Sequence, residues 1–270
     1  MKFRSILTGA LASLALVACA SWHLEPAQSF RQELSAQYMR LARADGRPIH
    51  RWFNPTYFAA KSYQAAHGVD VQPEQPDTWN IPHEERDELK NAYDMLQIAL
   101  VPDRKKVTKP VPAAQAQAAF DCWVEQADRN FIPSSQEKDC KAAFYEAFCR
   151  MYGGQCNASV KSDQIFRIYF DTNKTRIDAA GQSAIAAAVA SYKQGASEII
   201  VAGHADRVGK SDANLRLSKA RADAVRARLV RAGVPASKVM DRYFGEKAPL
   251  VPTPDEVPNR NNRRVLIVVR

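Results

Sequence analysis

An aspartate and an arginine that follow the same predicted strand could together bind a small zwitterion. Asp206 comes shortly after Ser197–Gly203, a short apolar run that is typical of a buried strand. Arg221 lies in 214–232, a segment without Gly or Pro that predicts a helix. A carboxylate can hold an ammonium group, and a guanidinium can grip a carboxylate with two parallel hydrogen bonds. The two residues therefore predict a site for a molecule that carries both charges.

Two further residues share the face of the helix on which Arg221 lies. Asn214, Leu217 and Arg221 stand at positions i, i+3 and i+7, which places them on one side of a helix. Asp206 lies in the loop before this helix, whose first backbone N–H groups attract anions. An aspartate beside an arginine is usually an ordinary ion pair when it is seen alone, and that is the alternative interpretation.

The segment from about residue 164 to the C-terminus predicts strands that alternate with helices. Strands are expected at Gln164–Phe170, Ser197–Gly203, Val239–Phe244 and Val265–Val269, and helices at Asp178–Lys193 and Asn214–Ala232. Alternation of this kind predicts an α/β sheet covered by helices. The last run, from Arg264 to Arg270, is apolar on both faces and is therefore expected inside the sheet.

The order of these motifs resembles the OmpA-like, peptidoglycan-binding domains of bacterial envelopes. The motifs are Ile168-Tyr169-Phe170-Asp171, Gly203-His204-Ala205-Asp206, Asn214, Leu217-Ser218, Arg221-Ala222 and Asn262-Arg263-Arg264-Val265. The resemblance covers roughly Ser162 to Arg270. It implies that residues 161–270 form an OmpA-like domain, a mixed sheet with helices of the α+β or α/β class.

The resemblance also implies a ligand, the meso-diaminopimelate residue of the peptidoglycan stem peptide. One centre of this residue carries both an ammonium and a carboxylate group. By resemblance, Asp206 holds the ammonium and Arg221 the carboxylate, while Asn214 adds hydrogen bonds. Asp171 and Asn173 match the other wall of the pocket.

Three other residues near this pocket have less direct roles. Leu217 shares the helix face of the pocket, and Arg264 is expected to support the pocket from below. His204 stands beside an aspartate, as a general base would. In the family that the sequence resembles, this histidine is a fold residue at a strand end, and we find no nucleophile paired with it. We therefore expect no enzyme activity and no cofactor.

The first nineteen residues predict export and lipid attachment. Basic residues precede an apolar stretch at 6–18 that is too short to span a membrane. Leu16-Val17-Ala18-Cys19 resembles a bacterial lipobox, which implies that the signal peptide 1–18 is removed and that Cys19 receives acyl chains. Ala20 follows, where an Asp often retains such proteins in the inner membrane, so we expect an outer-membrane anchor that faces the periplasm. The alternative is a plain secretory signal with an unrelated cysteine.

Four cysteines remain after Cys19. An even number in an oxidising compartment predicts two disulfides among three possible pairings. We favour Cys122–Cys140, which would join two antiparallel helices, and Cys149–Cys156, which would close a helix end. A zinc site is the alternative, but the close CxxC pair that usually supplies metal ligands is absent from the sequence.

Residues 19–160 predict an all-α, disulfide-bonded region that differs from the C-terminal part. We expect a helical region at 19–101, a Pro- and Lys-rich linker at 102–112 and a disulfide-stapled helical hairpin at 113–160. Helices are expected at Phe30–Ala44, Pro55–Ala66, Pro82–Leu100, Ala113–Asn130 and Gln136–Met151. This region contains no nucleotide-binding, metal-binding or protease motif.

Charge is divided unevenly along the chain. The segment 160–270 holds 20 Lys and Arg against 11 Asp and Glu, whereas 20–159 holds 16 against 18. A basic domain often binds nucleic acid, but export makes that partner implausible. Anionic peptidoglycan stems and lipid headgroups are the partners that the periplasm offers, and long-range attraction would assist docking to them.

Together these features predict an outer-membrane lipoprotein that binds peptidoglycan non-covalently and tethers the layers of the envelope. The main alternative is an assembly adaptor that recruits another envelope protein through its N-terminal helices. A third possibility is an enzyme that modifies the wall. Binding to isolated sacculi separates the first two, and release of soluble muropeptides would favour the third.

Overall fold

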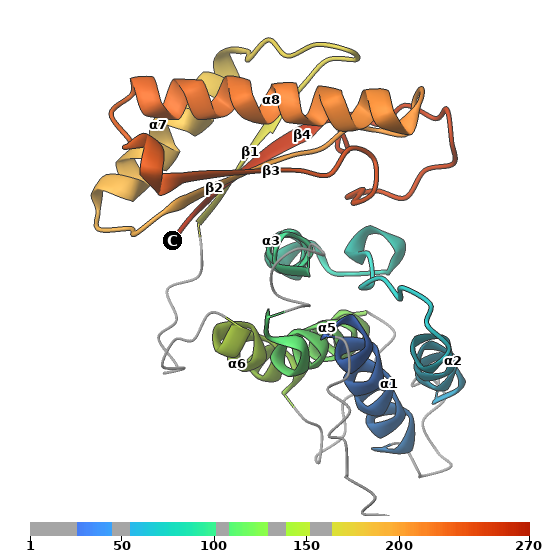
Figure 1. The fold of residues 1–270 in the computed structure, drawn as a ribbon. Coiled ribbons are helices and arrows are strands. Elements are labelled where there is room, and N and C mark those ends of the chain that lie inside the picture. Colours follow the sequence, from blue (N-terminus) through green and yellow to red (C-terminus); the bar gives the residue numbers. More distant parts are fainter. Residues whose placement is uncertain (1–25, 45–54, 101–107, 129–138, 152–163) are drawn as a thin grey trace, which may run out of the picture.

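The chain folds into a helical part and a part built around a sheet (Figure 1). The computed structural model describes residues 26–44, 55–100, 108–128, 139–151 and 164–270. The helical part contains α1 (Pro26–Ala44), α2 (Pro55–Ala66), α3 (His83–Leu100), α5 (Pro110–Gln126) and α6 (Cys140–Met151). The other part contains β1 (Gln164–Tyr169), α7 (Ala179–Lys193), β2 (Ile199–Gly203), α8 (Ser211–Arg231), β3 (Val239–Tyr243) and β4 (Arg264–Val269). The predicted combination of an all-α region and a mixed α+β domain is confirmed.

The five helices of the first part share one hydrophobic core. Leu34, Phe58, Leu89, Phe120 and Phe144 come from different helices and are all fully buried in it. The segments predicted on either side of a linker therefore pack as one unit. The linker itself was predicted at 102–112, but its last three residues belong to α5, because proline is well accommodated in the first turn of a helix. Residues 101–107 lie outside the described parts of the chain.

A buried polar cluster joins three of these helices. The Lys61 ammonium lies 2.7 Å from Oδ2 of Asp121 and also pairs with Glu74. Tyr38 donates a hydrogen bond to Asp121, and the indole N–H of Trp79 donates one to Glu74. Burial raises the pKa of Asp121 to about 6, against the opposing attraction of Lys61. Because every charge in this cluster has a partner, the cluster can fix how α1, α2 and α5 pack.

A disulfide joins the end of α5 to the start of α6. It links Cys122 and Cys140, the pair that the sequence analysis favours. At the opposite end of the hairpin, Arg150 donates a hydrogen bond to Gln115, so the two helices are antiparallel. Cys149 is also disulfide-bonded. Its predicted partner, Cys156, lies outside the described residues, and so does the predicted acylation site at Cys19.

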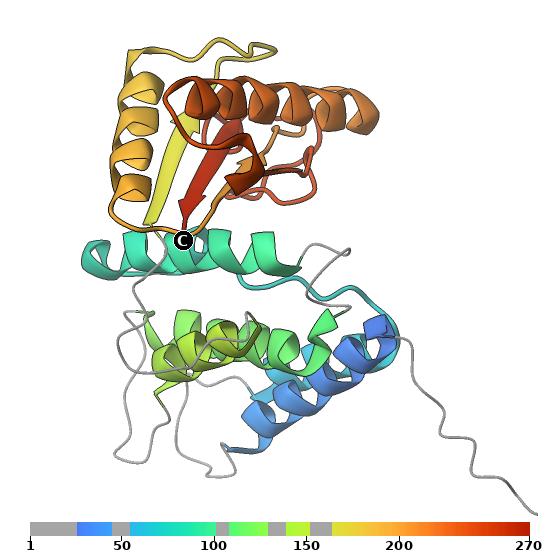
Figure 2. The ribbon, with the colours of Figure 1, turned by 60° about the vertical axis from the view of Figure 1, so that its left-hand side comes forward.

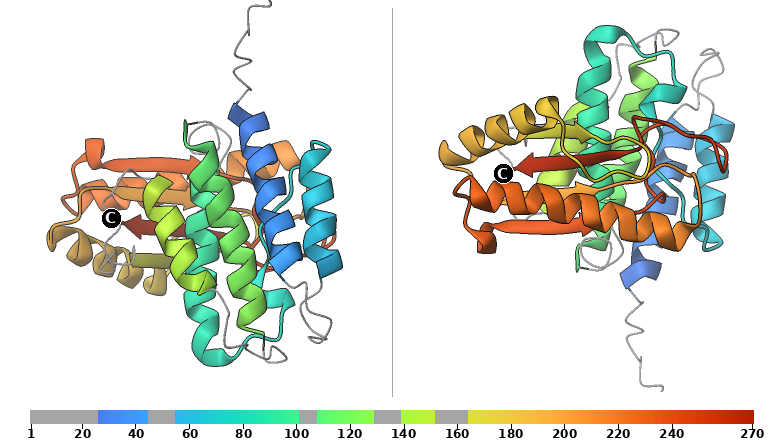
Figure 3. Two further views of the ribbon diagram at one scale, coloured as in Figure 1. Left: turned by 90° about the horizontal axis from the view of Figure 1, so that it is seen from below. Right: turned by 90° about the horizontal axis from the view of Figure 1, so that it is seen from above.

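The sheet has four strands in the order β1-β4-β2-β3. Strand β4 is antiparallel to both of its neighbours, whereas β2 and β3 are parallel. Helices α7 and α8 cover one face, and α3 lies across the other (Figure 2). The views from above and below in Figure 3 show α7 and α8 on one side of the sheet and the helical part on the other.

Side chains alternate across β4, as expected for a strand inside a sheet. Val265, Ile267 and Val269 pack into the core beneath α7 and α8. Leu266 and Val268 face the other way and meet Ile98 of α3. Both faces of the strand are thus buried, which explains its continuous apolar sequence.

Helix α3 is fixed to the sheet by a buried carboxylate. Asp94 lies 2.7 Å from Nη2 of Arg167 in β1 and 2.9 Å from Nη2 of Arg264 in β4. Nearby, Tyr93 donates a hydrogen bond to the Pro249 carbonyl. Arg264, which the sequence analysis placed below the ligand pocket, thus pairs with α3 in this structure. Its place in the strand alternation directs the guanidinium to the face that α3 covers.

The described residues contain neither a membrane-spanning helix nor a metal-binding cluster. No helix there combines the length and the apolar character needed to cross a bilayer. In the same parts of the chain, no three His, Cys, Asp or Glu side chains come together in a way that could hold a metal ion.

Candidate functional site

Three loops meet at one edge of the sheet. Strands β1, β2 and β3 point in the same direction, because β4 runs antiparallel to β1 and β2, and β3 is parallel to β2. The loops that follow these strands therefore leave the sheet at a common edge, where binding sites of α/β proteins commonly form. Helix α8 also begins at this edge.

Two small residues allow α8 to lie close to this edge. A Cβ atom on Gly203 would lie 2.1 Å from the Ser218 carbonyl oxygen, so only glycine fits where the helix crosses the end of β2. The Ser218 hydroxyl accepts a hydrogen bond from the Gly245 amide and donates one to the Leu215 carbonyl. The glycine and serine of the sequence motif thus position α8 against the loops that follow β2 and β3.

We expect Gly203→Ala to destabilise the sheet domain by about 2–3 kcal/mol, because the new methyl group must displace the α8 backbone. Urea denaturation followed by circular dichroism measures the change. Ser183→Ala, a similarly small change on the exposed face of α7, is the control and should leave the midpoint nearly unchanged. A Gly203→Ala protein as stable as the parent would show that the crossing of α8 over β2 is not close.

Arg221 lies at the centre of the three loops and is fully buried. Its guanidinium donates hydrogen bonds to the carbonyls of Lys174 (2.9 Å), His204 (3.1 Å) and Asp171 (3.0 Å). It also stacks near the Phe170 ring. Burial lowers the pKa of Arg221 to about 10, although Asp206 opposes this change. The side chain therefore remains charged at neutral pH and holds the loops after β1 and β2 together.

Asp206 is almost buried and is paired with an arginine that the sequence analysis did not select. Nη1 of Arg263 lies 2.8 Å from Asp206 Oδ2, and the Asn259 amide donates to the same oxygen. The Nε group of Arg263 donates to the Phe170 carbonyl at 3.0 Å. Arg263 belongs to the Asn262-Arg263-Arg264-Val265 motif, in which the sequence alone pointed to the neighbouring Arg264.

The other predicted site residues lie on the same loops and on α8. The amide nitrogen of Asn214 donates to the Val208 carbonyl (3.1 Å) and to Glu246 (2.7 Å), so this residue connects the loops after β2 and β3. Leu217 is half-buried on the same helix. Asp171 and Asn173 have exposed side chains. Asn173 adopts a positive φ of 53°, a conformation that asparagine tolerates better than most residues.

The predicted pair, Asp206 and Arg221, therefore lies in one place, but each residue has other partners in this structure. A carboxylate and two guanidinium groups, those of Arg221 and Arg263, meet where the loops converge. An ordinary ion pair between Asp206 and Arg221 does not describe this arrangement, because the bonded partner of Asp206 is Arg263. The grouping holds one negative and two positive charges, all of them buried beneath the loops.

His204 is buried below this grouping. Its Nδ1 donates to the Ala248 carbonyl at 3.1 Å, and its ring stacks on Phe244. Burial and the charge of Arg264 lower the pKa of His204 well below its ordinary value, so the ring is neutral. Nε2 has no hydrogen-bond partner among the described residues. These contacts fix the end of β2.

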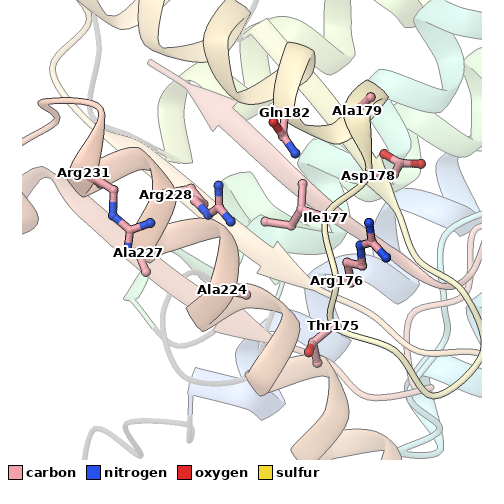
Figure 4. A pocket seen from close by; sticks show the side chains of 10 residues that line it. All are labelled: Thr175, Arg176, Ile177, Asp178, Ala179, Gln182, Ala224, Ala227, Arg228 and Arg231. Carbon is pink, nitrogen blue, oxygen red and sulfur yellow. The ribbon is translucent and has the colours of Figure 1, made fainter.

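A separate groove of about 570 Å³ lies between the start of α7 and the last turns of α8 (Figure 4). Its lining consists of Thr175, Arg176, Ile177, Asp178, Ala179, Gln182, Ala224, Ala227, Arg228 and Arg231. The sequence analysis did not find this groove, because its walls come from elements that are about fifty residues apart in the chain and no motif marks them.

Comparisons with known proteins find relatives of the sheet domain. The model of the OmpA family matches residues 169–263. The peptidoglycan-associated lipoprotein of Agrobacterium fabrum is 36% identical over 126 residues, which cover 43% of this chain and 70% of that protein. Outer membrane protein A of Yersinia pseudotuberculosis is 37% identical over 95 residues, 34% of this chain but only 26% of that longer protein.

Solved structures are similar over the same part of the chain. The OmpA-like domain of FopA1 from Francisella tularensis is 25% identical, with a TM-score of 0.36, and the match covers 39% of this chain and 70% of that one. The peptidoglycan-associated lipoprotein of Burkholderia pseudomallei is 29% identical, with a TM-score of 0.35, and the match covers 39% of this chain and 90% of that one.

Proposed function

Because this chain belongs to the OmpA family, we propose that it binds peptidoglycan non-covalently and tethers the layers of the bacterial envelope. One observation carries the proposal. Asp206 and Arg221 converge with Arg263 at the edge where the loops after the parallel strands meet. Two of the similar proteins named above are peptidoglycan-associated lipoproteins, which agrees with this function.

We propose meso-diaminopimelate as the part of peptidoglycan that occupies the site. Both hydrogen bonds to Asp206 end on Oδ2, so Oδ1 is the oxygen that would meet the ligand ammonium. Arg221 uses three of its five N–H groups for loop carbonyls. The remaining two, with Arg263 beside them, would bind the ligand carboxylate. Asp171 and Asn173 would form the exposed wall, and Asn214 and Leu217 the helical wall.

Sacculus binding tests this function. The chain from residue 20 onward is mixed with purified sacculi and sedimented, with free meso-diaminopimelate as competitor. We expect the protein to sediment with the sacculi and to be released by meso-diaminopimelate but not by cadaverine, which keeps both amines and has no carboxylate. Protein that stays in the supernatant would contradict peptidoglycan binding. Soluble muropeptides released during the incubation would instead favour an enzyme that modifies the wall.

We further propose that Cys19 carries the lipid that holds the protein at the outer membrane, facing the periplasm. Cys19→Ala should move the protein from the membrane fraction to the soluble periplasmic fraction, because the acyl chains supply the membrane affinity. Fractionation and the mass of the mature N-terminus measure the effect. An unchanged membrane fraction, with no acyl mass on the parent protein, would rule out the lipid anchor.

The adaptor function is the second candidate. It is favoured by Tyr63, which is 65% exposed on α2 and stacks on His67. An exposed aromatic pair is common in protein interfaces. A pull-down from envelope membranes with the full chain and with Tyr63→Ala tests it. Loss of a specific envelope protein from the variant, with sacculus binding unchanged, would support an adaptor role.

A further inference from the structure

The groove between α7 and α8 concentrates positive charge. Arg176 enters it from the loop after β1, and Arg228 and Arg231 enter it from the last turns of α8 (Figure 4). All three arginines are exposed. The acid in the lining is Asp178, whose carboxylate already accepts a 2.7 Å hydrogen bond from the Gly181 amide at the start of α7. No ion pair within the described residues joins the three arginines to an acid.

Helix electrostatics account for only part of this cluster. Basic residues favour the last turn of a helix, where the backbone carbonyls are unpaired, and Arg228 and Arg231 stand there. That preference does not explain Arg176, which comes from another element, or Gln182 of α7, which lines the same groove. Donors that converge from three elements into one hollow point to an anionic ligand.

The groove lies beside the site around Arg221 along helix α8. Arg221, Ala224, Arg228 and Arg231 stand at i, i+3, i+7 and i+10, so they follow one stripe of α8. Arg228 lies roughly 10 Å and Arg231 roughly 15 Å along the helix from Arg221. One of the three loop carbonyls that Arg221 binds belongs to Lys174. The next residue, Thr175, lines the groove.

We propose that this groove is a second subsite for the stem peptide, which binds a carboxylate other than that of diaminopimelate. The inference rests on the proposed function. An extended peptide advances roughly 3.5 Å per residue, so a stem held at Asp206 and Arg221 reaches the groove within a few residues. The stem is an acidic peptide, and its remaining carboxylates match the fork geometry of the arginines. The groove then makes the protein select a stem whose carboxylates are free.

Three probes test the subsite by titration calorimetry on the chain from residue 20 onward. They are free meso-diaminopimelate, a stem peptide with all carboxylates free, and the same peptide with every carboxylate outside diaminopimelate amidated. We expect the parent to bind the free-acid peptide roughly tenfold more tightly than the amidated one, as two exposed charge pairs would allow. The double variant Arg228→Gln/Arg231→Gln should lose this preference and bind free meso-diaminopimelate like the parent.

A matched control and an independent variant complete the experiment. Lys193→Gln/Lys238→Gln removes two exposed charges outside the groove and should keep the preference. Arg176→Gln, which changes a groove residue outside α8, should also reduce the preference for the free-acid peptide. Equal binding of the two peptides by the parent, or an unchanged preference in the folded groove variants, would overturn the subsite while leaving diaminopimelate binding intact. If the parent binds none of the three probes, the proposed function fails and the subsite with it.

Discussion

Asp94→Ala should lower the free energy of unfolding by about 3–5 kcal/mol, because it leaves buried arginine charge without its counter-charge. Asp94 and Arg264 have fully buried side chains, and Arg167 is mostly buried beside them. Nε and Nη1 of Arg264 have no hydrogen-bond partner among the described residues. Asp94 therefore supplies most of the compensation that this guanidinium receives.

Urea denaturation, followed by circular dichroism and by tryptophan fluorescence, measures this effect. Asp87→Ala is the matched control, since Asp87 is an exposed carboxylate on the same helix. It should change the unfolding free energy by less than about 0.5 kcal/mol. The four tryptophans all precede residue 124, so fluorescence reports on the helical part. If Asp94→Ala is as stable as the control, α3 is not held to the sheet by this carboxylate.

Arg221→Ala should destabilise the sheet domain and also abolish detectable binding to sacculi. The substitution removes three hydrogen bonds from a charged donor to buried loop carbonyls, each worth about 1.5–3 kcal/mol. Loss of binding in this variant alone would therefore not separate a ligand contact from a collapsed site. This variant therefore tests mainly whether Arg221 holds the loops together.

Arg221→Lys separates the two roles. Lysine keeps the charge but cannot form the fork of hydrogen bonds. We expect a folded protein of intermediate stability whose binding to sacculi is weakened by tens-fold or more. Arg226→Ala is the control, because that half-buried arginine makes one long contact with the Ala236 carbonyl and a loose pair with Asp241. A folded Arg221→Lys protein that binds like the parent would remove Arg221 from the ligand site.

The elements of the sheet domain could be predicted from the sequence because their local signals agree. The apolar run before Gly203 became β2, the segment without Gly or Pro became α8, and the run apolar on both faces became the inner strand β4. In the helical part, α2 has the predicted bounds. Helix α6 begins at Cys140, later than the predicted Gln136, and the residues between them that precede Asp139 lie outside the described parts.

Contacts between distant segments could not be predicted in the same way. Asp94 lies in a helix rich in charged residues, where an acid normally faces water, and nothing local shows that two arginines of the sheet will meet it. The sequence places Arg263 and Arg264 side by side, and only the strand alternation decides which one faces the site. The groove between α7 and α8 has the same origin, because Arg176 comes from the loop after β1 whereas Arg228 and Arg231 come from α8.

Titration of meso-diaminopimelate into the isotope-labelled chain tests the proposed site most directly. Amide shifts should saturate and should cluster in the loops after β1 and β2 and at the start of α8. In Asp206→Asn the affinity should fall at least about tenfold, as expected when a charged hydrogen bond is lost. Asp223→Asn, which alters only an exposed pair with Lys219, should bind like the parent. Saturable binding of parental strength by a folded Asp206→Asn protein would contradict the assignment of this site.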